Sequence, residues 1–289
     1  MLPAADPAGA VGAGNDPVPG SPGTTVPVRP LTFREQLDLP FALIQADIKA
    51  LAAAAGLALV LAELVVVGIT GLGSHLTDGS DAGTAWAAIL GTLGCAWLVR
   101  LFLRGVTVPL GLATVGGSPI GLRTAFERMT ARFTPLLIAQ LMFTLTGLAV
   151  LVGGGFLIVT LPFALVGLGY LRAKRFLVVP VIFAERADYG AAVQRTKVLV
   201  FEAEWSLTGL WLCQRMLYTL LTVPLLALPW FVSDFSGTRR WAVIALLTGA
   251  ALLIAAFAEI VDSSSRVVSY VDRRCRREGL DIRVPEARR

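Results

Sequence analysis

The stretch FLVVPVIFAERADYGAAVQRTKVLVFEAEW, residues 176–205, carries a charged segment between two apolar runs. Asp188 is a favoured helix N-cap, and winding the following residues at 3.6 per turn gathers Ala192, Thr196 and Leu199 on one stripe. A helix with one apolar stripe and a basic flank lies at a membrane interface when apolar runs precede and follow it. The stretch therefore predicts an all-α, polytopic membrane fold in which interfacial helices alternate with spanning helices.

The composition of the whole chain agrees with this interpretation. Of its 289 residues, 55% are hydrophobic and 16% are charged, and the mean hydropathy is +0.72, which is too apolar for a soluble domain of this size. The net charge of +5 does not predict nucleic-acid binding, because the Lys and Arg residues are spread over the ends of apolar runs. The partners we expect are membrane lipids, in particular an anionic inner leaflet, and another membrane protein.

Six apolar runs are each long enough to cross a hydrocarbon layer of about 30 Å. They cover residues at about 51–73, 84–103, 135–152, 156–184, 206–232 and 241–261. The run over 156–184 contains Arg172 and the prolines Pro162 and Pro180, so we expect it to be kinked or partly interfacial at its inner end. The sequence therefore predicts a six-helix transmembrane bundle.

Each pair of runs is preceded by an amphipathic segment, at about 34–50, 118–133 and 188–204. In the second of these segments, Ser118 and Pro119 are the residues we expect at a helix start. The recurring order of one amphipathic helix and two spans leads to the hypothesis of a threefold internal repeat.

The distribution of basic residues predicts the orientation. Of the 25 Lys and Arg residues, only Arg239 and Arg240 fall in loops assigned to the outer side, as the positive-inside rule requires when both termini are cytoplasmic. Residues 1–30, rich in Pro, Gly and Ala, are expected to be a disordered cytoplasmic tail. Residues 31–270 then form the membrane domain, and residues 271–289 form a basic cytoplasmic tail.

Ionisable residues inside apolar runs are costly and suggest functional sites. Counted from the inner ends of their runs, Glu63 and Arg215 lie at similar depths of about 18 Å and 14 Å, so we expect an ion pair between them, with a solute or proton pathway as the alternative. Arg100 and Glu259 lie near the inner surface, where we expect their side chains to reach headgroup water.

Two further groups of residues are candidate contact sites. A basic cluster follows the sixth run, where each cation near an anionic leaflet contributes on the order of 1 kcal/mol, so we expect contact with lipid headgroups or a role in setting topology. Its members are Arg273, Arg274, Arg276 and Arg277. Val198 and Phe201 point away from the apolar stripe of their helix, and we expect a partner surface there.

Three segments carry a resemblance to a known family: RPLTFREQLDLPFALIQADIKAL near the beginning, VVPVIFAERADYGAAVQRTKVLVFEAEW in the centre, and SYVDRRCRREGLDI near the end. They resemble bacterial integral membrane proteins related to the membrane domain of glycerophosphodiester phosphodiesterases, and the resemblance runs from about Arg29 to Ile282. It implies a fold and a multi-pass protein of the bacterial cytoplasmic membrane. The family's soluble catalytic domain has no counterpart here, so the resemblance implies no catalysis.

The residues show no catalytic constellation, no metal-ligand spacing and no cofactor motif, so we expect no catalytic, metal or cofactor site. The leading hypothesis is a non-enzymatic scaffold or a partner-binding and lipid-interacting membrane domain. A transporter or channel is the first alternative, and its polar cavity would be lined by Glu63, Arg215, Gln140 and Gln214. The second alternative is a lipid-modifying enzyme, whose cleft would gather acids such as Glu185, Asp188 and Asp262.

Overall fold

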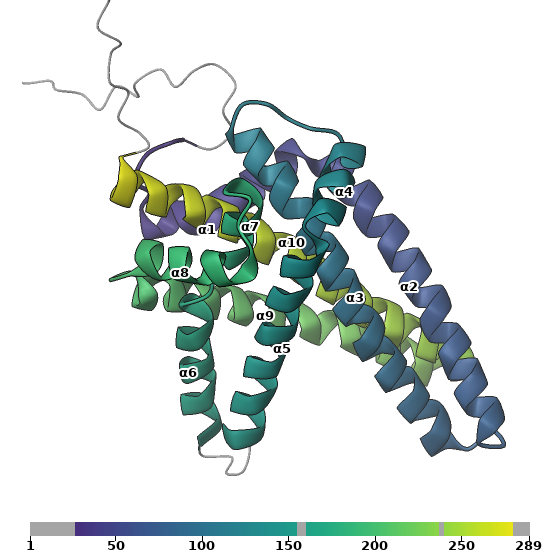
Figure 1. Cartoon of the computed structure of the whole chain (residues 1–289). Coiled ribbons are helices and arrows are strands. Elements are labelled where there is room, and N and C mark those ends of the chain that lie inside the picture. Colours follow the sequence, from purple (N-terminus) through teal and green to yellow (C-terminus); the bar gives the residue numbers. More distant parts are fainter. Residues whose placement is uncertain (1–26, 155–159, 237–239, 280–289) are drawn as a thin grey trace, which may run out of the picture.

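The computed structural model describes residues 27–154, 160–236 and 240–279, and the regular elements within these residues are helices (Figure 1). The helices are α1 Phe33–Ala46, α2 Ile48–Leu76, α3 Asp81–Val115, α4 Leu122–Ala131, α5 Phe133–Gly154, α6 Leu161–Ala173, α7 Val178–Ala184, α8 Tyr189–Val200, α9 Glu204–Ser236 and α10 Arg240–Glu278. The all-α prediction is therefore confirmed for the described residues.

Short helices and long hairpins follow one another in the predicted order. The helices α1, α4 and α8 each precede a pair, namely α2 with α3, α5 with α6, and α9 with α10. Figure 1 shows the α2/α3 and α5/α6 hairpins pointing the same way and splaying apart, with the three short helices toward the opposite end of the molecule. The recurring order agrees with the proposed repeat, which stays a prediction because no superposition of the three units supports it.

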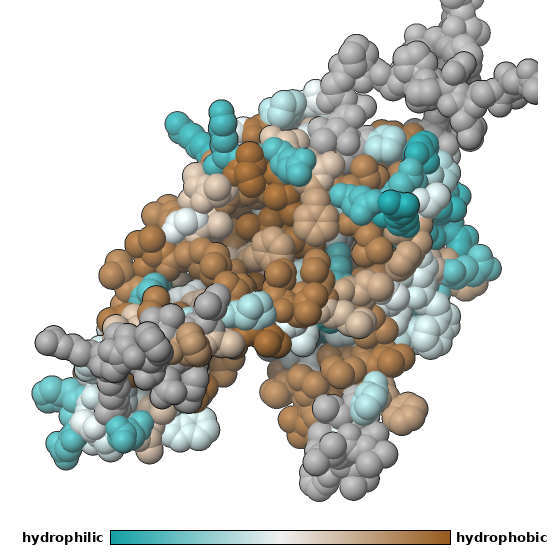
Figure 2. Space-filling view, turned by 180° about the vertical axis from the view of Figure 1, so that it is seen from behind, coloured by the Kyte–Doolittle hydropathy of each residue, from teal (hydrophilic) through white to brown (hydrophobic). Residues whose placement is uncertain are grey.

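Five of the described helices are long and apolar enough to cross a membrane. They are Ile48–Leu76, Asp81–Val115, Phe133–Gly154, Glu204–Ala227 and Trp241–Glu278. Figure 2 shows hydrophobic residues covering the middle of the molecule, with hydrophilic residues gathered toward the end that carries α4 and at the tip of the α2/α3 hairpin. An apolar flank between two polar ends is the surface that a multi-pass membrane protein presents to lipid.

The predicted single span over 156–184 is wrong, because two helices, α6 and α7, occupy its described part. Pro180 lies in the first turn of α7, where its missing N–H costs nothing, whereas a continuous helix would bring its ring against the carbonyl of Phe176. The chain turns between Ala173 and Val178 instead. Residues 156–159 of the predicted span lie outside the described residues.

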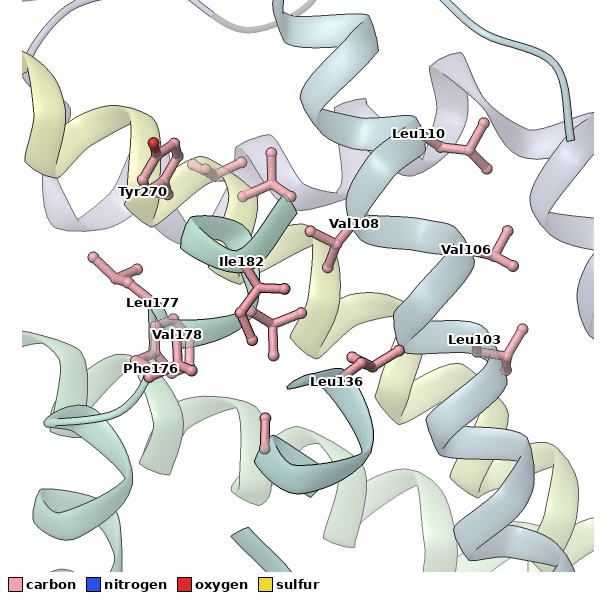
Figure 3. Packing of buried hydrophobic residues seen from close by; sticks show 14 of the residues in the cluster. Leu103, Val106, Val108, Leu110, Leu136, Phe176, Leu177, Val178, Ile182 and Tyr270 are labelled. Atoms are coloured by element: carbon pink, nitrogen blue, oxygen red, sulfur yellow. The ribbon is translucent and has the colours of Figure 1, made fainter. Parts of the chain in front are cut away.

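Two helices continue beyond the runs predicted at 84–103 and 241–261. The 35 residues of α3 make it about 52 Å long, and α10 reaches Glu278, so the beginning of the predicted tail at 271–289 is helical; residues 280–289 lie outside the described part. The extensions bury Val106 and Val108 of α3 and Val267 of α10 completely. Figure 3 shows Val108 pointing toward Ile182 of α7, so these extensions and α7 form an apolar core beside the spans.

The first helix begins with a capping box. The hydroxyl of Thr32 accepts from the backbone N–H of Glu35, and the Glu35 carboxylate accepts from the backbone N–H of Thr32 at 2.8 Å. This backbone donor, together with the guanidinium of Arg29, holds the pKa of Glu35 below its usual range. The cap fixes where α1 begins and so positions the helix to pack against α10, with which it makes its main contacts.

Close packing of α3 on α4 and α5 depends on Gly105. A Cβ at this position would lie 2.4 Å from Cγ of Met129 and 2.9 Å from Cδ2 of Leu136. We expect Gly105→Ala to lower the free energy of unfolding by about 1–3 kcal/mol, because the two side chains have to leave their places in the core. Equilibrium unfolding in mixed detergent micelles measures the change.

Gly94→Ala is the matched control on the same helix, since a Cβ there meets nothing within 4 Å. Alanine favours a helix over glycine by about 1 kcal/mol, so this variant should unfold no more easily than the parent chain. A Gly105→Ala protein as stable as Gly94→Ala would contradict the close approach of the helices.

Candidate functional site

A buried ionic network joins α3 to α10. The Glu259 carboxylate, fully buried, accepts from Nε of Arg104 at 2.7 Å and from Nε of Arg100 at 2.9 Å. Arg104 is itself buried and also donates to the side-chain oxygen of Gln140. The prediction that Glu259 reaches headgroup water is wrong, because its carboxylate is fully buried between α3 and α10. The side chain of Arg100 is 28% exposed, so the prediction for Arg100 stays a prediction.

The predicted ion pair between Glu63 and Arg215 does not form. Arg215 pairs with Asp262 of α10, which also accepts from the hydroxyl of Tyr218 at 3.0 Å. Glu63 accepts from the hydroxyl of Thr248 at 2.8 Å. The two residues share a depth but face different parts of α10.

The glutamines expected around a transporter cavity are likewise engaged with protein groups. Gln140 accepts from Arg104, and Nε2 of Gln214 lies 2.5 Å from the hydroxyl of Ser265. Both glutamines are buried. In the described residues, the four groups expected to line a transport cavity are therefore paired with other side chains of the bundle.

The basic cluster that follows the sixth run is held against the protein. Arg273 and Arg276 both pair with Asp272, at 2.8 Å and 3.0 Å. Arg274 pairs with Glu278 at 2.8 Å, and Arg277 donates to the backbone oxygen of Phe201 at 2.5 Å. These four guanidinium groups are therefore engaged with protein, and the helical extension of α10 is what brings their partners within reach.

Val198 and Phe201 are exposed, with 60% and 57% of their surface accessible. The guanidinium of Arg277 lies 5.4 Å from the centre of the Phe201 ring. The partner surface predicted there stays a prediction, since the exposure supports it and no bound partner tests it.

The acids expected in an enzymatic cleft do not gather in one. Asp188 caps α8 by accepting from the backbone N–H of Ala191 at 3.1 Å. Glu185 accepts from Arg195 and from the hydroxyl of Tyr270, and Asp262 belongs to the buried network with Arg215. Within the described ranges, no group of three or more His, Cys, Asp or Glu residues is arranged to hold a metal ion.

A cleft of about 890 Å³ opens beside α4, at the end of α3. Its apolar wall comes from α3 and α10 and from the end of α7, and includes Leu112, Val115, Phe183 and Val271. Its basic residues are Arg128, Arg132, Arg186 and Arg274. The described residues that line it include no Asp or Glu. A cleft with an apolar wall and cationic side chains fits a molecule that has an apolar part and an anionic group.

Three of these arginines have no carboxylate partner among the described residues. Arg128 lies in the last turn of α4 and Arg132 is the C-cap of that helix, whereas Arg186 follows α7 in the left-handed region at φ 53°. Arg274 differs, because Glu278 partly compensates its charge. The cleft therefore holds an uncompensated positive charge supplied from two separate parts of the chain.

The helix that supplies two of the arginines also carries apolar anchors. Phe126 and the adjoining Phe133 are 47% and 45% exposed, whereas Ala125 and Met129 pack into the protein. A short helix with exposed aromatic residues beside arginines is the arrangement of an interfacial helix. The mouth of the cleft is therefore bordered by a helix suited to the surface of a membrane.

The sequence located part of this cleft. The amphipathic segment at 118–133 contains Arg128 and Arg132, and its basic character was the signal that predicts an interfacial helix. Arg186 gave no signal, since a single arginine after an apolar run is ordinary in a membrane protein. No protein-family model, curated protein or solved structure matches the chain. The resemblance to the membrane domain of glycerophosphodiester phosphodiesterases therefore stays a prediction.

Proposed function

We propose that the chain is a non-enzymatic, multi-pass membrane protein that holds an anionic phospholipid of the cytoplasmic leaflet in the cleft beside α4. One observation carries the proposal: three arginines that have no carboxylate partner in the described part of the chain border an apolar-walled cleft of about 890 Å³. A phosphate group would lie among the guanidinium groups, and acyl chain would lie against the apolar wall. The exposed Phe126 and Phe133 support a membrane origin for this ligand, because exposed aromatic residues on and next to α4 suit a helix at the lipid surface.

The sequence predicted contact with lipid headgroups at the arginines of α10, whereas the proposed site lies beside α4. The cluster at residues 273–277 already has protein partners, so its charges are largely compensated. Arg128, Arg132 and Arg186 make no ion pair with the residues that the structure describes, and guanidinium groups bind phosphate in a bidentate fashion. Arg274 is the member of the original cluster that also lines the cleft.

Replacing Arg128, Arg132 and Arg186 together by Gln should weaken the binding of phosphatidylglycerol on the order of 100-fold. Each cation contributes on the order of 1 kcal/mol, so that removing all three costs about 3 kcal/mol. Native mass spectrometry of the purified protein, titrated with phosphatidylglycerol and separately with phosphatidylcholine, measures the two affinities. Binding of the zwitterionic lipid should change little.

The matched control replaces Arg34, Arg123 and Lys197 by Gln, which removes the same charge from exposed positions outside the cleft. We expect this control to bind phosphatidylglycerol as the parent chain does, within about threefold, because exposed charges far from the ligand are screened. An equal loss in both triple variants would show a general surface attraction and would contradict a site at the cleft.

We also propose six membrane crossings with both termini on the cytoplasmic side. The five long apolar helices supply five crossings, and α6 supplies the return after α5. The basic residues support this orientation: Arg128, Arg132 and Arg186 then lie on the cytoplasmic side, as the positive-inside rule favours.

Reporter fusions test this topology. Green fluorescent protein fused after residue 289 should fluoresce, because it folds in the cytoplasm, whereas alkaline phosphatase fused at that point should be inactive. The same pair of reporters inserted between His75 and Asp81, in the link from α2 to α3, should give the opposite result. Active phosphatase at the C-terminal fusion would contradict an even number of crossings with a cytoplasmic N-terminus.

A further inference from the structure

The ring of Phe143, on α5, lies among three guanidinium groups. The Cζ atom of Arg172 is 3.9 Å from the ring centre, that of Arg266 is 5.1 Å away, and that of Arg104 is 5.4 Å away. These arginines come from α6, α10 and α3, three helices that meet around α5. Cation–π contact stabilises such groups but does not neutralise their charge.

The cations in this region outnumber the acids. Five guanidinium groups interact with two carboxylates, an excess of three positive charges. The guanidinium groups belong to Arg100, Arg104, Arg172, Arg215 and Arg266, and the carboxylates to Glu259 and Asp262. Uncompensated charges in a protein interior are costly, so a region of this kind calls for a counterion.

Two cations of this region, Arg172 and Arg266, make no ion pair within the described residues, and of these two only Arg266 is buried. Its surface is 2% exposed. Its Nε atom is buried without a hydrogen-bond acceptor. Arg104, by contrast, has both Glu259 and Gln140 as partners. An acceptor missing from the protein's own residues is therefore localised at Arg266.

A small cavity lies at this position, with a volume of about 10 Å³, which is room for one particle of the size of a water molecule. Its polar side chains are those of Arg104, Arg175, Arg266 and Tyr189, and its other lining side chains are apolar. Guanidinium groups donate hydrogen bonds and accept none. Water at this position would find three cationic donors and one hydroxyl, whereas an anion would satisfy all of the donors at once.

We propose that a small inorganic anion of the size of chloride occupies the cavity between Arg104, Arg175 and Arg266. The cavity is too small for a phosphate group, which separates this site from the cleft beside α4. Chloride is larger than water, so the proposal requires the guanidinium ends of Arg175 and Arg266 to move slightly apart when the anion binds. The anion offsets part of the excess charge and accepts from the donors that the chain leaves unpaired.

Thermal unfolding of the purified protein in an uncharged detergent tests the proposal. Replacing gluconate by chloride at constant ionic strength should raise the unfolding temperature in a saturable way, by about 5 °C or more at saturation. Bromide should act like chloride, and inorganic phosphate at the same ionic strength should not. No chloride-specific rise, or a rise with phosphate alone, would overturn the proposal.

The variant Arg266→Gln distinguishes an anion site from a merely unpaired charge. In gluconate the variant should unfold at a higher temperature than the parent chain, because a buried unpaired cation is removed; in saturating chloride it should unfold at a lower temperature, because the bound anion is lost. A variant that is more stable than the parent in both buffers would overturn the proposal.

A second variant keeps the test decisive if Arg266→Gln does not fold. Arg175 lines the cavity but is otherwise exposed, so Arg175→Gln should fold and should need at least about tenfold more chloride for the same rise in unfolding temperature. The exposed Arg123→Gln is the matched control and should leave the chloride dependence unchanged. Equal chloride dependence in Arg175→Gln and Arg123→Gln would count against the site.

Discussion

The variant Glu259→Gln should lose about 3–5 kcal/mol of stability, the cost of breaking a buried ion pair by removing one partner. The carboxylate is fully buried and pairs with Arg104 at 2.7 Å and with Arg100 at 2.9 Å. Glutamine keeps the shape but not the charge, so that two cations lose their shared counter-charge. Equilibrium unfolding in mixed micelles measures the loss.

A double-mutant cycle shows whether the loss comes from the pair. The chain with both Arg104→Met and Glu259→Met should be less destabilised than the sum of these two single variants, because neither Arg104 nor Glu259 then leaves the other's charge unpaired. Glu127→Gln is the control, since Glu127 pairs with Arg123 on the exposed face of α4 and the change should cost less than about 0.5 kcal/mol. Additive losses in the cycle would contradict a direct pair between Arg104 and Glu259.

Replacing Asp272 by Asn should release α1 from the bundle. The Asp272 carboxylate is fully buried and accepts from the backbone N–H of Leu31 at 2.7 Å and from Nε2 of Gln36 at 3.1 Å. It also pairs with Arg273 and Arg276 of its own helix. One side chain thus joins the start of α1 to the end of α10, and a neutral amide loses the charge that all four donors share.

We expect Asp272→Asn to lower the free energy that holds α1 on the bundle by about 3 kcal/mol. The protection of the α1 amides against hydrogen exchange should then fall on the order of 100-fold, while the α3 amides stay protected. Asp38→Asn is the control, because Asp38 is exposed and pairs weakly with Arg34 at 3.8 Å. Unchanged protection of α1 in Asp272→Asn would contradict this junction.

Local patterns in the sequence predicted the short helices well. The cap at Asp188 is confirmed, since its carboxylate accepts from the backbone N–H of Ala191. The sequence could predict this cap because the two residues are only three positions apart. The start predicted at Ser118 and Pro119 is wrong: α4 begins at Leu122, after a turn in which Gly117 takes a φ of 71°. Glycine reaches that conformation without strain, so the turn extends further than the cap residues suggested.

Contacts between distant helices could not be predicted in the same way. Counting residues from a helix end gives the depth of Glu63 and Arg215 but not the direction in which each side chain points, and α10 supplies other partners to both. The prediction for Glu259 was wrong for a related reason, because the run lengths did not reveal that α3 and α10 continue as packed helices. The cleft could not be predicted for the same reason, because it brings together Arg186 and α4, which lie far apart in the sequence.

The most direct measurement is photo-cross-linking with phosphatidylglycerol that carries a diazirine on its headgroup, in bilayers that contain the full chain. We expect the labelled peptides to contain the residues around the cleft, above all Arg128, Arg132 and Arg186, and an excess of unlabelled phosphatidylglycerol to suppress the labelling. Labelling spread evenly over the basic residues of the cytoplasmic side, with the cleft unlabelled, would contradict a lipid held beside α4.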